Sequence, residues 1–308
     1  MSILVVGTVA FDAIETPFGK TDKIIGGSAT YIGLSASYYT KDIHLISVVG
    51  DDFPAAALKN FNKRGIRTSG IQVMKGKKSF FWSGKYHLDM NTRDTLRTDL
   101  NVLADFNPVI PETDRKPEYL MLGNIEPSLQ ISVIKQLRSR PKLIAMDTMN
   151  YWMDNSRPAL NKVLKMVDVL IINDEEARQL SGEFSLLKAA RRIQKSGPKI
   201  LVVKKGEHGA LLFYGEQLFF APALPLESVF DPTGAGDTFA GGFIGHIAKT
   251  KNSTFTNMKR AIIYGSAMAS FCVEKFGPER LMELKAPEVK ARVNNFVQLT
   301  KFDLNGSK

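Results

Sequence analysis

The sequence predicts an α/β fold of three layers, in which helices cover both faces of a mostly parallel central sheet that carries a small β lid. The main observation is that short apolar runs alternate with helical segments from residue 119 onward, as in βαβ units. A second observation is a pair of buried-strand patterns at residues 2–6 and 43–49, each followed by a glycine. The later apolar runs occupy residues 119–122, 143–146, 169–172 and 200–203.

The first hundred residues combine these strands with a second pattern. Residues 29–39, between the two N-terminal strands, have helical character. Residues 71–88 are rich in β-branched and aromatic residues and are interrupted by a turn-like basic stretch at 75–78. This pattern predicts a β insertion, so that segments of about 7–30 and 71–100 would form the lid over the carboxyl ends of the main sheet.

The rest of the chain completes one domain. Residues 210–214 and 217–220 predict a hairpin, and the chain is then mostly helical as far as Phe296. No internal repeat or linker divides the sequence. Residues 1–308 are therefore expected to form a single domain that carries the lid.

Composition restricts the classes of function. The 308 residues are 44% hydrophobic and 23% charged, as in ordinary globular proteins. No run approaches the ~20 apolar residues of a membrane span, and the N-terminus lacks a signal-peptide pattern, so we expect no membrane partner and a cytoplasmic location. The one cysteine, Cys272, excludes an intrachain disulfide and fits a reducing compartment. The four histidines lack metal-ligand spacing.

The net charge of +10 comes from basic residues that are spread along the chain. The densest basic clusters, at residues 75–78 and 191–195, are short, and no helix-turn-helix, zinc or aromatic–basic module is present. We therefore expect no nucleic acid partner. A basic surface instead attracts anionic substrates such as ATP.

The most informative stretch is residues 231–239, Asp-Pro-Thr-Gly-Ala-Gly-Asp-Thr-Phe. The two glycines let the backbone approach a ligand closely, so the amides of Gly234, Ala235 and Gly236 are expected to form an anion cradle at a helix start. A carboxylate there repels phosphate unless it takes a proton from an incoming hydroxyl, which makes Asp237 a candidate general base. An ordinary helix start, with Asp237 complementing the helix dipole, is the alternative that these residues alone leave open.

Other nucleotide-binding motifs are excluded. Residues 19–21, Gly-Lys-Thr, resemble the end of a P-loop, but Ile14 stands where that motif needs glycine. Gly234 and Gly236 are followed by Phe239, so the turn is not a dinucleotide fingerprint. The protein-kinase set of motifs is absent.

Over roughly residues 2–298, the order of motifs resembles the ribokinase-like carbohydrate kinases, also called the PfkB family. The resemblance rests on a diglycine at residues 26–27, on residues 173–176 and 204–209, and above all on the glycine turn followed by Ala-Gly-Gly-Phe at 240–243. It implies a ribokinase-like fold and phosphoryl transfer from ATP, with Asp237 as general base and the turn amides as an anion hole. This agrees with the interpretation from the residues alone.

The resemblance also implies sites for ions. Asn173 and Glu176 match an Asn-x-x-Glu motif that positions Mg²⁺ and phosphate, mainly through water. The spacing also makes sense from the residues alone. Asn173 ends an apolar strand and Glu176 lies in the first turn of the helix that follows, near the ligand-binding edge of a sheet. Asp231 and the Thr233 carbonyl match positions that bind a monovalent cation, usually K⁺, in many members. A turn-capping role for Asp231 is the alternative.

Residues on the nucleotide side are expected in the loop after residue 203. Lys204, Gly206 and Gly209 match the loop that holds ATP in the family, with glycines permitting close approach. Many members carry Thr at the position of Lys204. We therefore expect this lysine either to make the nucleotide contact of that Thr or to contact a phosphate instead.

Residues on the acceptor side are expected near the N-terminus and in the lid. Asp12 and the diglycine Gly26 and Gly27 match acceptor-binding positions, where a carboxylate accepts hydrogen bonds from sugar hydroxyls. Tyr31 stands where sugar kinases of the family usually carry Asn, which weakens a ribokinase assignment. Asn91 and Arg93 are candidate polar contacts from the lid, with surface decoration as their alternative.

These features predict an ATP-dependent sugar kinase that phosphorylates a primary hydroxyl of a small carbohydrate. A nucleoside kinase, such as one acting on adenosine, is the alternative within the same class, and a phosphosugar kinase is third. A non-catalytic sugar or nucleotide sensor on the same fold is the alternative of another class, against which the retained Asp237 and turn glycines argue. The lid aromatics Phe80, Phe81, Trp82 and Tyr86 predict a homodimer through the lid, or packing on the main domain.

Overall fold

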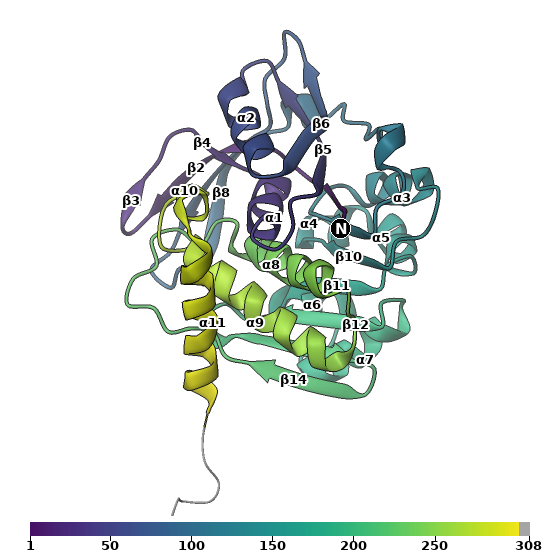
Figure 1. The fold of residues 1–308 in the computed structure, drawn as a ribbon, viewed down its shortest axis with the longest axis vertical. Coiled ribbons are helices and arrows are strands. Elements are labelled where there is room, and N and C mark those ends of the chain that lie inside the picture. The colour runs from purple at the N-terminus through teal and green to yellow at the C-terminus, as the bar shows by residue number, and fades with distance from the viewer. Residues whose placement is uncertain (302–308) are drawn as a thin grey trace, which may run out of the picture.

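Two sheets organise the chain (Figure 1). Across residues 1–301, which the structure, a computed structural model, describes, nine strands form a central sheet and five form a smaller second sheet. The central order is β14-β13-β12-β11-β10-β9-β1-β5-β6, parallel from β12 to β6 and antiparallel at β12–β13–β14. Its strands are β1 (Ile3–Val6), β5 (Ile43–Gly50), β6 (Ile66–Met74), β9 (Tyr119–Leu122), β10 (Leu143–Asp147), β11 (Val169–Asn173), β12 (Ile200–Lys204), β13 (Ala210–Tyr214) and β14 (Gln217–Ala221).

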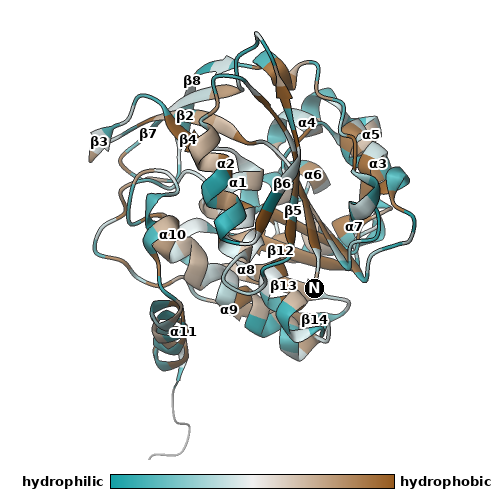
Figure 2. Cartoon of the chain, turned by 45° about the horizontal axis from the view of Figure 1, so that its top comes forward, coloured by the Kyte–Doolittle hydropathy of each residue, from teal (hydrophilic) through white to brown (hydrophobic). Residues whose placement is uncertain are grey.

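The strands are buried on both faces because alternate side chains enter two separate cores. In β1, Ile3 and Val5 belong to one core, whereas Leu4 and Val6 belong to the other. Figure 2 shows hydrophobic strands at the centre and hydrophilic helix faces outside. The first core lies under α1 (Ser28–Ala36), α2 (Ala55–Lys63), α8 (Ala235–Thr250) and α9 (Phe255–Cys272), and the second under α3 (Pro127–Gln136), α5 (Arg157–Leu164), α6 (Asp174–Ser181) and α7 (Leu186–Lys195). The expected three layers are thus present.

The remaining helices are short or peripheral. Figure 1 shows α11 standing apart from the sheets at the C-terminal end. These helices are α4 (Asn150–Asn155), α10 (Glu279–Glu283), α11 (Ala286–Thr300) and the 3₁₀ turns η1 (Asn101–Leu103), η2 (Glu112–Asp114) and η3 (Gly206–His208).

The second sheet comes from the segments expected to form a lid, and it keeps the name lid. Its order is β3-β2-β7-β8, with β4 paired to β2. Its strands are β2 (Ala10–Thr16), β3 (Gly19–Lys20), β4 (Ile24–Gly26), β7 (Phe81–Tyr86) and β8 (Arg93–Asp99). The expected segments 7–30 and 71–100 reach too far, since residues 71–74 pair with 47–50 in the central sheet and α1 begins at Ser28. The apolar alternation through Ile71 and Val73 suits either sheet, so it does not mark this boundary.

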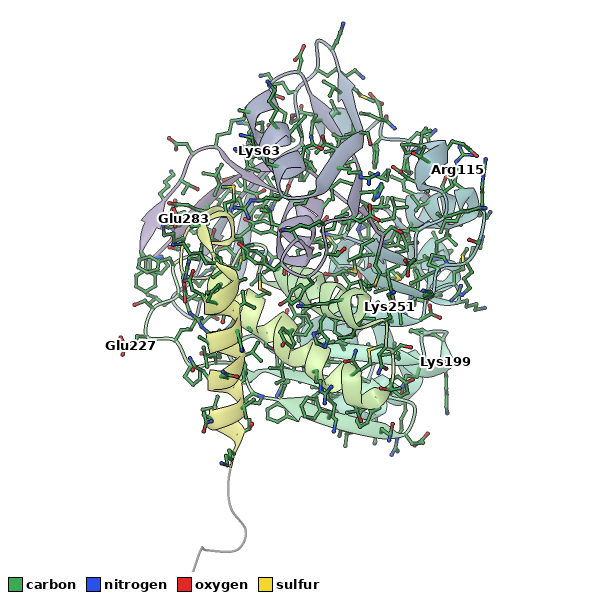
Figure 3. All side chains as sticks on the ribbon, viewed as in Figure 1. Lys63, Arg115, Lys199, Glu227, Lys251 and Glu283 are labelled. Atoms are coloured by element: carbon green, nitrogen blue, oxygen red, sulfur yellow. The ribbon has the colours of Figure 1, made fainter. Side chains whose placement is uncertain are left out.

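Asp12, Asp147, Glu176 and Asp231 are buried, whereas many other charged residues lie on the outside of this fold. Among the exposed lysines labelled in Figure 3, Lys63 lies near the top of the view, away from Lys199 and Lys251. In the part of the chain that the structure describes, no helix is both long and apolar enough to span a membrane.

Candidate active site

The glycine turn leads into α8 with the geometry of an anion-binding helix start. Gly234 adopts φ 74°, and a Cβ on it would lie 2.4 Å from the Tyr31 ring, so this position requires glycine. The amides of Gly234, Gly236 and Asp237 donate no hydrogen bond within the described chain. The Ala235 amide instead donates to the preceding proline carbonyl at 3.1 Å, because the turn closes on itself. The free amides at this helix start are thus those of Gly234, Gly236 and Asp237, and an anion cradle here stays a prediction.

Asp231 holds the turn in place. Its Oδ1 accepts a hydrogen bond from the Thr233 amide, and its Oδ2 accepts one from the Gly277 amide, each at 2.8 Å. The Cys272 thiol lies 3.6 Å from the Thr233 carbonyl. These bonds give Asp231 a turn-capping role. A monovalent cation at Asp231 and Thr233 stays a prediction.

Asp237 lies in the first turn of α8 with the electrostatics of a general base. Its Oδ1 is buried and has no hydrogen-bond partner among the described residues. Burial and then the Asp147 carboxylate raise the pKa of its carboxyl to about 7, against the opposing effects of Lys204 and Arg93. A base whose pKa is close to the working pH is well matched to accepting a proton. This carboxylate can therefore deprotonate a bound hydroxyl.

Strands β10 and β12 end beside this carboxylate, at the edge where open α/β sheets bind ligands. Lys204 ends β12, and its Nζ lies 3.4 Å from Oδ2 of Asp147 at the end of β10. A Cβ on Gly236 would lie 2.8 Å from the same Nζ, so the ammonium lies at the glycine turn. Burial disfavours its charge, but nearby carboxylates, first Asp147 and then Glu176, raise the pKa of Lys204. Asp147 is the site residue that no motif marks; its signal is its place at the end of an apolar run.

Asn173 and Glu176 cap α6 reciprocally. The Glu176 amide donates to Asn173 Oδ1 at 2.7 Å, and the Asn173 amide donates to Glu176 Oε2 at 2.8 Å. Burial and then the charge of Asp147 raise the pKa of Glu176 to about 7, against the opposing effect of Lys204. Oε1 of Glu176 has no hydrogen bond within residues 1–301. Since Mg²⁺ typically takes one or two carboxylates and completes its shell with water and phosphate, this free oxygen fits an Mg²⁺ site held through water.

The two glycines of the loop after β12 have different structural reasons. Gly209 adopts φ 88°, and a Cβ on it would lie 2.0 Å from the Ala221 carbonyl, so packing on β14 requires glycine whether or not a nucleotide binds. Gly206 adopts φ 54°, and a Cβ on it would lie 2.5 Å from Asn91 Oδ1 in the lid. The lid therefore contacts the loop that is expected to hold ATP.

On the acceptor side, Asp12 faces the diglycine. A Cβ on Gly26 would lie 1.8 Å from Asp12 Oδ2, and one on Gly27, at φ 92°, would lie 2.5 Å from a backbone carbonyl. Burial and then the charge of Asp231 raise the pKa of Asp12 to about 7, against the opposing effect of a hydrogen bond from the Gly27 amide. The charge of Asp237 contributes to the same shift. Asp12, the candidate residue for binding the acceptor, and Asp237, the candidate base, thus belong to one site.

Tyr31 lies in α1 beneath the glycine turn. Its side chain is 1% exposed, with the ring against Gly234. Burial raises the pKa of its hydroxyl well above the ordinary value, and Asp12 adds to the rise. The hydroxyl has no hydrogen-bond partner among the described residues. It is a protonated donor near Asp12 whose hydrogen bond is unsatisfied within the described chain.

The two lid candidates reach the donor half of the site. Asn91 lies against Gly206 of the loop that is expected to hold the nucleotide, and its contact with an acceptor stays a prediction. Arg93 begins β8 in register with Tyr86 of β7, whose hydroxyl accepts a hydrogen bond from Thr233 Oγ1 at 3.2 Å. The β7–β8 hairpin thus extends from the glycine turn to the loop after β12. The spacing of residues in the sequence does not predict these contacts.

Comparisons with known proteins agree with this geometry. Residues 2–284 match a family model described as pfkB family carbohydrate kinase. A cytidine kinase from Thermococcus kodakarensis is 28% identical over 248 residues, covering 79% of this chain and 87% of that protein. A solved nucleoside kinase from Methanocaldococcus jannaschii, of the ribokinase family, superposes with TM-score 0.76 and 20% identity, over 96% of this chain and 98% of that one. The structure of a protein from E. coli in complex with ATP and Mg²⁺ superposes with TM-score 0.79 and 19% identity, and covers 96% of this chain and 99% of that one. The expected ribokinase-like fold is confirmed.

Proposed function

The chain belongs to the pfkB family of carbohydrate kinases, and from this premise we propose that it transfers the γ-phosphoryl group of ATP to the primary hydroxyl of a nucleoside. Kinase activity toward an alcohol group follows from the family. The observation that carries the proposed mechanism is the carboxylate of Asp237, which has a buried unpartnered oxygen beside free amides at a helix start. A sensor without catalysis would not need this base.

In the proposed step, Asp237 takes the proton of the acceptor hydroxyl while that oxygen forms a bond to the γ-phosphorus. The bond between the γ-phosphorus and the bridging oxygen breaks in line, and ADP leaves with the electron pair. The free amides of Gly234 and Gly236 oppose the charge on the phosphoryl oxygens. Asn173 and Glu176 would hold Mg²⁺ through water, and the bound ion would neutralise further phosphate charge.

The lid excludes water from this step. Tyr86 is 4% exposed and bonds to the glycine turn, and Asn91 lies against the nucleotide loop. A site covered in this way keeps water from competing with the acceptor for the phosphoryl group.

A nucleoside is favoured over a free sugar as the acceptor by two observations. Tyr31 replaces the Asn that sugar kinases of the family usually carry, and its unpartnered hydroxyl lies near Asp12. The cytidine kinase relative acts on a nucleoside by name. A free sugar is the second candidate, since Asp12 and the diglycine are positions that sugar kinases share by resemblance.

A coupled assay of ADP release across nucleosides, pentoses, hexoses and sugar phosphates tests the proposal. We expect release that depends on both ATP and a nucleoside, and a product phosphorylated at the primary hydroxyl. Turnover with free sugars alone would establish the second candidate. The absence of acceptor-dependent release across the whole set would contradict the proposal.

The lid aromatics bear on assembly. Phe80, Phe81 and Trp82 are half-buried, whereas Tyr86 is committed to its own glycine turn. A homodimer through the first three side chains stays our prediction. Gel filtration with light scattering should give twice the chain mass, and a monomer mass would contradict it.

A further inference from the structure

The tip of the lid reaches two segments of the expected donor site: the glycine turn, expected to hold the transferring phosphoryl group, and the loop expected to hold the nucleotide. Tyr86, at the end of β7, accepts a hydrogen bond from Thr233 of the glycine turn at 3.2 Å. Asn91 lies against Gly206 of the nucleotide loop, where a Cβ would be 2.5 Å from its Oδ1. The β7–β8 hairpin therefore bridges the glycine turn and the nucleotide loop.

Arg93 is a cation that this hairpin carries to the site. It pairs in register with Tyr86 across the two strands. Within residues 1–301 it forms no ion pair, whereas Arg97 on the same strand is bound to Asp99 at 2.8 Å. The positive charge of Arg93 opposes the rise in the pKa values of Asp237 and Glu176. The guanidinium thus lies where its charge acts on the Asp237 and Glu176 carboxylates, and it has no ion-pair partner among residues 1–301. Its own contacts are uncharged: it hydrogen-bonds to the Tyr86 hydroxyl and lies 5.8 Å from the centre of the Trp82 ring.

The nearby ammonium belongs to the main domain and is paired with a carboxylate there. Lys204 Nζ lies 3.4 Å from Asp147 and beside Gly236. A phosphoryl group in transfer spreads its charge over three equatorial oxygens, which the free turn amides approach from the side of the main domain. On the side of the lid, a guanidinium matches two phosphate oxygens at once through its planar fork.

We infer that the Arg93 guanidinium binds two oxygens of the transferring γ-phosphoryl group, so that closure of the lid completes the catalytic site. This inference rests on the proposed phosphoryl transfer. In that step the acceptor oxygen bonds to the γ-phosphorus, its proton passes to Asp237, and the bridging oxygen leaves with ADP. Arg93 donates hydrogen bonds throughout and takes no proton. We therefore expect the role of Arg93 to appear in kcat. The sequence alone predicts a contact with the acceptor, which would appear in the acceptor KM.

Steady-state kinetics of Arg93→Gln test the inference, with Arg97→Gln as the matched control. The control removes the same group from the same strand, but from an exposed ion pair with Asp99. We expect Arg93→Gln to lower kcat by ~10²-fold or more, the scale for losing one donor to transition-state charge, with little change in the acceptor KM. Arg93→Lys, which keeps the charge and loses the fork, should fall between the two. Arg97→Gln should match the wild type.

Two further readouts separate catalysis from a structural effect. Guanidinium ion added to Arg93→Gln should restore part of kcat and leave Arg97→Gln unchanged. Loss of the Arg93 charge should also move the acid limb of the kcat–pH profile to higher pH, because that charge lowers the pKa of Asp237. Asp147 on β10 and Lys204 on β12 also face Asp237, and both remain in the variant.

Equal kcat values in the two glutamine variants would overturn the inference. So would a raised acceptor KM with kcat unchanged, which would return Arg93 to acceptor binding. A wild-type enzyme without acceptor-dependent ADP release would overturn the proposed function as well. Because the wild type is measured first, the two failures are distinguished.

Discussion

The Lys204 ammonium lies 3.4 Å from the Asp147 carboxylate, and these two residues end strands β12 and β10 at the same edge of the sheet. The pair holds a positive charge beside Gly236 and next to the base. Its geometry allows Lys204 to serve both the phosphate and the ionisation of Asp237.

Replacing Lys204 by Met should impair the base as well as the phosphate site. Because Lys204 lowers the pKa of Asp237, its loss raises that pKa, and the acid limb of the kcat–pH profile should move to higher pH. We expect kcat at pH 7 to fall roughly tenfold or more. Lys205→Met is the control, since Lys205 has no ion pair in the described structure. An unshifted profile in Lys204→Met would contradict this electrostatic role.

Asp237→Asn should stabilise the fold in neutral and alkaline solution. Folding raises the pKa of this carboxyl from 3.8 to about 7, so the folded chain binds a proton that the unfolded chain has released. The free energy of unfolding therefore falls as pH rises through that window. Removing the carboxylate should raise Tm at pH 8 by on the order of a few degrees and leave Tm at pH 4 unchanged.

The control for this experiment is Glu216→Gln, a change in the exposed turn between β13 and β14. Its Tm should follow the wild type at both pH values. A lower Tm for Asp237→Asn at pH 8 would show that the carboxylate is satisfied by partners that the structure does not contain.

Gly234→Ala should cost more stability than backbone strain alone. Gly234 and Gly182 adopt almost the same φ, 74° and 73°, but an added Cβ meets the Tyr31 ring at 2.4 Å only in the first case. We expect Gly182→Ala to cost about 1–2 kcal/mol from the left-handed backbone and Gly234→Ala about 1–3 kcal/mol more from overpacking. Urea denaturation measures both values, and equal costs would contradict the close packing of Tyr31.

Tyr31→Phe should reveal whether the unpartnered hydroxyl meets the acceptor. Loss of this hydrogen bond should cost about 1–2 kcal/mol of acceptor binding, which corresponds to a rise in the acceptor KM of roughly five- to thirtyfold. Tyr39→Phe is the control, because its hydroxyl is likewise buried and without a partner among the described residues. It should leave KM unchanged. Equal KM values in the two variants would remove Tyr31 from the acceptor site.

The main sheet was predictable because its strands are short apolar runs buried on both faces. The expected runs at 119–122 and 200–203 lie within β9 and β12, and the helix expected after the glycine turn is α8. Lid boundaries were less predictable, since residues 71–74 suit either sheet and only pairing with β5 decides between them.

Within the site, motif residues were predictable and their partners were not. Asp237, Asn173 and Glu176 stand in recognisable spacing, and the structure brings them to one sheet edge. Asp147 has no motif, and its contact with Lys204 depends on the neighbouring order of β10, β11 and β12. The place of Asn91 against Gly206 depends on how the β7–β8 hairpin crosses the site, which is a tertiary distance.

Acceptor-dependent ADP release by Asp237→Asn, measured beside the wild type and beside direct ATP binding, tests the central claim most directly. We predict that the wild type phosphorylates a nucleoside at its primary hydroxyl. The variant should bind ATP nearly as well and turn over ~10²-fold or more slowly, because only the proton acceptor is lost. Near-normal turnover in Asp237→Asn would contradict the assignment of Asp237 as the general base.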